Sequence, residues 1–214
     1  MKKPRILISV LCLLCCTGFA MADEAIGTPP VPVDTIAPRV LGSNTFQIDL
    51  GLYVPLFSLN DNGSVFTPGA NLTLGGAARL KWSAFLNSSL ALGIDLSGAF
   101  TGGPNSANNN TYFFIANIGP HITNFFRIGN FEFPLSFSPA LNIMNYGTNT
   151  YVGFSLRPGI GVYYDVTPSW SFGLNIQYWW CPEIFLNNSP NGLSPVNNRY
   201  GNMLEISISA LYSF

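Results

Sequence analysis

Apolar residues occupy every second position over long stretches of the chain after Ser43. In the first stretch they are Phe46, Ile48, Leu50, Leu52, Val54 and Leu56, and the positions between them are mostly polar or small. Strict alternation of this kind predicts a β-strand with one apolar face and one mixed face.

The same alternation recurs and predicts eight strands. The segments cover residues 46–56, 72–83, 90–100, 112–121, 131–142, 152–164, 170–180 and 204–214. The fourth is less regular, because Phe113 and Ile115 share a face with Asn117 and His121. The turn that follows it fits either Asn124 or the Gly129-Asn130 pair, and the pattern leaves both open.

The predicted connections alternate between short and long. Residues 85–88 and 165–169 are short, whereas residues 57–69, 101–111, 143–150 and 181–199 are longer and rich in Asn, Gly, Ser and Pro. Short periplasmic turns with longer extracellular loops are typical of outer-membrane barrels, and an even strand number brings both ends of the barrel to the periplasmic side. The pattern therefore predicts an all-β fold, a transmembrane antiparallel up-and-down β-barrel of eight strands.

Composition supports a lipid-covered surface. Only 9% of the residues are charged, beside 48% hydrophobic and 14% aromatic, whereas soluble domains carry about 25% charged residues. A secreted β-sandwich or a soluble barrel is the competing structure, but its polar face should be rich in Lys and Glu. Here that face is mostly Gly, Ser, Asn, Thr and Ala. No basic run follows residue 5, so nucleic acid is not an expected partner.

The first residues are typical of an export signal. Basic residues precede the apolar run 6–19, and Ala20-Met21-Ala22 follows it, which predicts a signal peptide over residues 1–22 that is cleaved after Ala22. Residues 23–43 contain four prolines without periodicity and are expected to form a Pro-rich periplasmic segment before a barrel over residues 44–214. Cys181 is then the one cysteine left in the exported chain, so no internal disulfide is expected.

The last strand carries a family resemblance. It runs from Leu204 to a terminal Phe214, with Tyr212 two positions before the end. This ending resembles the assembly signal of bacterial outer-membrane barrels, and with the signal peptide and the alternating segments it resembles the small eight-stranded class, such as the outer-membrane protein W and X groups. The resemblance implies an outer-membrane location in a diderm bacterium, contact with outer-membrane lipid, and the barrel-assembly machinery as a partner in biogenesis.

Aromatic residues on the apolar faces gather near the strand ends. They are Trp82, Tyr164, Trp170 and Tyr212 toward the short turns, and Phe100, Tyr112, Tyr178, Trp180 and Tyr200 toward the long loops. At about 3.3 Å per residue and a tilt near 40°, Trp170 and Trp180 are roughly 25 Å apart along the membrane normal, the height of the apolar band. We therefore expect two interfacial girdles.

Seven charged residues fall on the inward faces of six strands. They are Asp49, Arg79, Lys81, Asp95, Glu132, Arg157 and Glu205. An unpaired buried charge costs several kcal/mol, so a compensated network is expected. We predict that Arg79 pairs with Asp95, and that Arg79 or Lys81 neutralises Asp49 and Glu205. Because the interior of an eight-stranded barrel is just wide enough to be filled by side chains, the network is predicted to be a structural plug rather than a relay.

No catalytic or metal-binding constellation can be assembled around His121, the single histidine, which lies near the periplasmic end. We therefore expect no enzymatic activity, no cofactor and no metal. The predicted function is a membrane scaffold whose loops, chiefly residues 181–199, meet host or environmental ligands. The alternative, implied by the W-type resemblance, is a narrow conduit for small hydrophobic molecules. An apolar inner pocket for them would use the inward residues Tyr53, Phe113, Ile115, Tyr151, Met203 and Leu211.

Overall fold

The computed structural model describes residues 39–60, 62–66, 72–104, 110–147, 149–184 and 198–214. The strands are β1 (Asn44–Asn60), β2 (Val65–Phe66), β3 (Gly75–Phe85), β4 (Leu90–Pro104), β5 (Asn110–Ile128), β6 (Phe131–Tyr146), β7 (Asn149–Asp165), β8 (Trp170–Glu183) and β9 (Arg199–Ser213). The predicted signal peptide and most of the Pro-rich segment lie outside the described residues. None of the described residues forms a helix that is long and apolar enough to cross a membrane.

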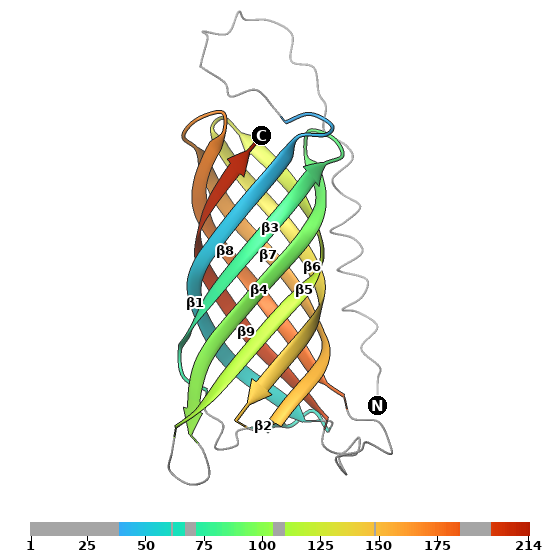
Figure 1. Ribbon diagram of the computed structural model, residues 1–214, viewed down its shortest axis with the longest axis vertical. Coiled ribbons are helices and arrows are strands. Elements are labelled where there is room, and N and C mark those ends of the chain that lie inside the picture. Colours follow the sequence, from blue (N-terminus) through green and yellow to red (C-terminus); the bar gives the residue numbers. More distant parts are fainter. Residues whose placement is uncertain (1–38, 61, 67–71, 105–109, 148, 185–197) are drawn as a thin grey trace, which may run out of the picture. The chain divides into compact units, whose positions relative to one another are not determined.

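The strands form a closed antiparallel barrel. Each of β1 and β3 to β9 pairs with its neighbour in chain order, and β9 pairs back onto β1 from Thr45↔Ser213 to Asn60↔Arg199. The two-residue strand β2 adds to β1 beside this wall, as Figure 1 shows at its lower end. Closure leaves no free edge over most of the wall, and the predicted eight-stranded barrel is confirmed.

Apolar side chains cover the outside of the barrel. Leu50, Ile94 and Ile208 are more than half exposed, at 57%, 56% and 65%, whereas the neighbouring Asp49 and Asp95 are completely buried. An apolar surface of this extent would associate in water, so hydrocarbon is its physical environment. The period-2 pattern therefore separates the lipid face from the lumen face.

Three short turns define one end of the barrel, which we call the turn end. They are residues 86–89, 129–130 and 166–169, and the start of β1 and the end of β9 lie beside them (top of Figure 1). Gly129 has a φ of 60°, so the turn after β5 is the Gly129-Asn130 pair rather than Asn124. The opposite end, toward which β1, β4 and β8 run, is the loop end.

One connection at the loop end, between β6 and β7, is much shorter than the sequence suggested. The expected long loop 143–150 is wrong, because β6 and β7 continue to the pair Tyr146↔Asn149 and turn at Gly147, where φ is 62°. Asn145 and Thr150 bond across this hairpin at 3.1 Å. The polar residues of this segment are paired within the two strands. Their polar composition alone therefore predicted a loop where the strands continue.

The ladder between β5 and β6 is interrupted near its middle. The pairing of β5 with β6 is continuous on both sides of a gap between Ile118↔Leu141 and Ile122↔Phe137. The register places Pro120 opposite Pro139 within that gap. Neither proline has a backbone N–H to donate, so the ladder is interrupted there.

Candidate functional site: the filled lumen

The lumen contains all seven of the charged residues predicted to face inward. Asp49, Arg79, Lys81, Asp95, Glu132, Arg157 and Glu205 are all buried. They come from β1, β3, β4, β6, β7 and β9, so most of the wall contributes to the interior. The structure shows which of these residues form ion pairs with one another.

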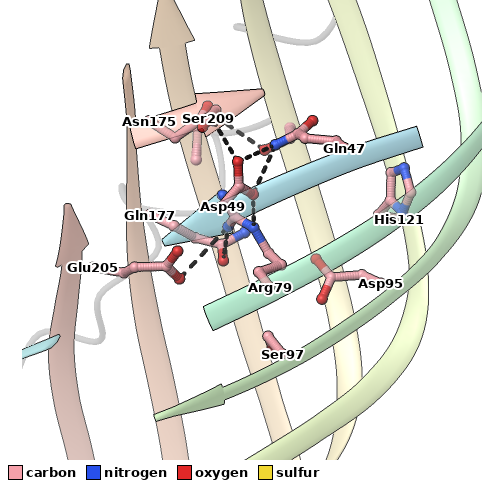
Figure 2. A network of polar contacts seen from close by, with 12 residues as sticks. Gln47, Asp49, Arg79, Asp95, Ser97, His121, Asn175, Gln177, Glu205 and Ser209 are labelled. Atoms are coloured by element: carbon pink, nitrogen blue, oxygen red, sulfur yellow. Dashed lines mark hydrogen bonds and ion pairs between the residues drawn. The ribbon is translucent and has the colours of Figure 1, made fainter. Parts of the chain in front are cut away.

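Arg79 is the centre of the first ion-pair group. Its Nε donates to Asp49 Oδ2 at 2.5 Å, and its Nη1 lies 3.6 Å from Glu205 Oε2. The same Nη1 donates to Gln177 Oε1, and the Gln47 amide donates to both oxygens of Asp49 at 2.7 Å. Figure 2 shows the guanidinium among these acceptors. Arg79 therefore neutralises both acids on the two strands that close the barrel.

Arg157 forms the second ion pair by reaching across the lumen from β7 to β4. Its Nη2 donates to Asp95 Oδ1 at 2.9 Å, and its Nη1 donates to Ser97 Oγ. The guanidinium lies 5.4 Å from the centre of the Trp179 ring, a cation–π distance. The Trp179 indole N–H donates to Glu205 Oε2 at 3.0 Å, which links this pair to the Arg79 group.

The expected pairing of Arg79 with Asp95 is wrong. The β3–β4 turn places Phe85 opposite Ala91, so Lys81 rather than Arg79 faces Asp95. The register expected from the sequence was two residues off, and Asp95 is paired from across the lumen instead. Lys81 is buried beside it and, within the described part of the chain, forms no ion pair.

A third group of charges occupies the turn end. Glu132 accepts from Arg39, with Nη1 2.6 Å from Oε1, and from Arg127. Arg127 Nη2 also lies 3.0 Å from Asp165 Oδ2, and Ser171 donates to that same acid.

Sequence reasoning missed both of these arginines. Arg127 is an odd-numbered residue of β5, like the inward-facing Asn117 and His121. Alternation extended to residue 127 would therefore have predicted that Arg127 faces the lumen. Arg39 lies in the segment without periodicity, where no pattern points to it.

His121 is a buried lumen residue. Its Nε2 lies 2.8 Å from Ser83 Oγ, and its ring covers Gly93, whose absent side chain leaves the room. Among the described residues, no group of three or more His, Cys, Asp or Glu side chains could hold a metal ion. The Ser83–His121 contact joins β3 and β5 across β4, whereas His121 Nδ1 is buried without a hydrogen-bond partner among the described residues.

Apolar side chains fill the lumen toward the loop end. Tyr53, Phe113, Ile115 and Met203 belong to one buried cluster with Trp179 and Cys181, and Tyr151 packs against it. Leu211, the sixth residue of the proposed inner pocket, lies instead with Phe85 and Tyr163 in a cluster near the turn end.

Cys181 was expected in the loop 181–199. It lies within β8, where it is buried at 1% exposure. Most of the remaining loop, residues 185–197, falls outside the described residues.

The outward aromatic residues form ring contacts near both ends. Trp170 packs on Tyr212 with ring centroids 4.9 Å apart, and the Tyr212 ring is 5.8 Å from that of Phe214. Trp180 stacks on Tyr200 at 6.2 Å. The others lie as follows: Tyr164 contacts Phe131, Tyr178 donates to Asn202, and Trp82 is exposed on β3.

Comparisons with known proteins agree with this architecture. A protein-family model matches residues 30–212, from before β1 to one residue short of the end of β9. Neisserial surface protein A superposes with a TM-score of 0.56 and 17% identity over 81% of this chain and 99% of that one. The outer membrane protein OprG from Pseudomonas aeruginosa superposes with a TM-score of 0.53 and 9% identity over 83% and 98%. The chain has the fold of the small eight-stranded outer-membrane β-barrel proteins.

Two sequence relatives of this barrel come from Treponema pallidum (strain Nichols), and both are uncharacterized proteins. One is 28% identical over 171 residues, which is 72% of this chain and 58% of the relative. The other is 31% identical over 104 residues, which is 49% of this chain and 46% of the relative. The chain therefore spans about half the length of these relatives.

Proposed function

We propose that this outer-membrane barrel is a non-enzymatic membrane scaffold with a side-chain-filled lumen, which presents interaction loops at the loop end. The observation that carries the proposal is the sequence of layers in the lumen: charges at the turn end, two linked ion pairs at mid-height, and an apolar cluster toward the loops. A lumen closed by its own side chains leaves the loops as the functional surface.

The barrel would have a fixed orientation in the outer membrane and would contact partners at both of its ends. The turn end faces the periplasm and the loop end faces outward, as the alternation of turn and loop lengths favours. Tyr212 and Phe214 end the strand that the barrel-assembly machinery would read, and the girdle residues contact lipid headgroups. Host or environmental ligands would meet the loop residues 185–197 and their neighbours.

Single-channel recording in planar bilayers tests the filled lumen. The wild-type barrel is expected to stay silent at voltages where an open porin conducts. Arg79→Ala removes the central counterion of Asp49 and Glu205 and is expected to introduce conductance, because water can hydrate the two released carboxylates. Regular current steps from the wild type would contradict the proposal.

A conduit for small hydrophobic molecules is the second candidate, and the apolar cluster at the loop end favours it. Transfer of an apolar fluorescent dye into proteoliposomes distinguishes the two functions. A conduit predicts faster transfer with wild type than with Ala77→Leu, which adds bulk among Tyr53, Phe113 and Trp179. Equal rates with the two proteins and with empty liposomes support the scaffold.

A further inference from the structure

The turn end of the lumen holds a side chain that does not come from a strand. Arg39 precedes β1, yet its side chain is only 8% exposed. Its Nη1 donates to both oxygens of Glu132, at 2.6 and 2.7 Å, and its Nε donates to Ser213 Oγ at 3.2 Å. Arg39 therefore enters the barrel mouth and is bound there by charge-assisted hydrogen bonds.

Two phenyl rings enclose the same guanidinium. Arg39 Cζ lies 5.1 Å from the ring centroid of Phe85 and 5.1 Å from that of Phe125. A guanidinium is planar and weakly hydrated, so it can lie against aromatic faces while its N–H groups bond acceptors at its edge. A compact, strongly hydrated ammonium lacks this combination.

The barrel supplies every wall of this site. Phe85, Phe125, Glu132 and Ser213 belong to β3, β5, β6 and β9. Glu132 also pairs with Arg127, its register partner on β5. Only the bound cation comes from outside the strands, so the site and its occupant are separable.

We propose that the turn end is a guanidinium-binding site and that Arg39 fills it in cis as a strap that closes this mouth of the lumen. When Arg39 is absent, a free guanidinium cation or the arginine of a peptide can take its place. The proposal holds whether the loop end serves a scaffold or a conduit, because it concerns the opposite end of the barrel.

Chemical rescue tests the site. The full chain is refolded in detergent micelles, and thermal unfolding is followed by tryptophan fluorescence with guanidinium chloride at about 1–10 mM, far below the molar concentrations that denature proteins. Arg39→Ala is expected to unfold at a lower temperature than wild type, and guanidinium should raise its midpoint in a saturable way, since a ligand of the folded state stabilises it. Methylammonium chloride at equal concentration should have no such effect.

The double variant Arg39→Ala/Glu132→Gln is the matched control, because it keeps the cavity and removes the carboxylate. Guanidinium is expected to leave its midpoint unchanged, as it should in wild type, where Arg39 occupies the site. Rescue of equal size in the double variant, or no rescue of Arg39→Ala beyond that given by methylammonium, would overturn the proposal.

Limited trypsin digestion gives a measurement that does not depend on the folding of Arg39→Ala. Trypsin must accommodate an arginine side chain, so the buried Arg39 is expected to resist cleavage before Val40 in the folded wild type. Glu132→Gln should speed this cleavage. Rapid release of a fragment beginning at Val40 from folded wild type would show that Arg39 is not held in the mouth.

Discussion

Arg79 holds two carboxylates that would otherwise be buried without a counterion. Asp49 and Glu205 are 0% and 1% exposed, so both carboxylates stay inside the lumen without their counterion when the guanidinium is removed. Breaking a buried pair by deleting one partner typically costs about 3–5 kcal/mol, far more than an intact pair contributes relative to apolar residues.

We therefore expect Arg79→Ala to lower the free energy of unfolding by roughly 3–5 kcal/mol. Urea unfolding in detergent micelles, followed by tryptophan fluorescence, measures the change. The triple variant Arg79→Met/Asp49→Asn/Glu205→Gln should lose much less, because it leaves no uncompensated charge. An equal loss in both variants would mean that packing, not charge, sets the effect.

The burial of Cys181 gives a prediction of its own. In the folded barrel its thiol is enclosed beside Met203 and Trp179, so a membrane-impermeant maleimide should not label it. Labelling should become complete after denaturation, as measured by the mass increase of the intact chain. A chain with Cys181→Ala and Asn87→Cys, which moves the thiol to an exposed turn, should react in the folded state.

At the turn after β5, the cost of a substitution is set by backbone conformation rather than by packing. Gly129 has a φ of 60°, and a Cβ there would meet no atom within 4 Å. The left-handed conformation costs an L-residue about 1 kcal/mol or more, so Gly129→Ala should lower the free energy of unfolding by about 1 kcal/mol. Gly76→Ala is the matched control, because its Cβ also meets open space and its φ is not positive. Equal urea midpoints for both variants would contradict this.

The strands themselves were largely predictable from alternation, and their ends were not. β5 continues past Asn124 to Ile128. Asn124 pairs with Leu135 of β6, so this polar residue lies within the strand and does not end it. The hairpin at Gly147 likewise extends through Asn145 and Thr150. Hydrogen bonding between neighbouring strands decides where a strand ends, and a single sequence does not contain the neighbour's register.

At the scale of the whole molecule, the turn end and the loop end should face opposite sides of the membrane. External protease added to intact cells is expected to cut residues 185–197 and to spare the turn at residues 86–89. Immunoblotting with tags placed at each end identifies the fragments. Cleavage at the turn 86–89 while the loop stays intact would reverse the orientation.

Alternation along the chain determined the barrel, its strand number and seven of the charges that face inward. These follow from the sequence because side chains of a strand alternate between faces whatever the strand pairs with. The partners of those charges followed only from the closed structure. Arg157 reaches Asp95 across the lumen, and Arg39 enters from a segment without periodicity. Such contacts depend on a two-residue shift at one turn and on which walls face each other after closure, and both are properties of the folded ring rather than of any local run of residues.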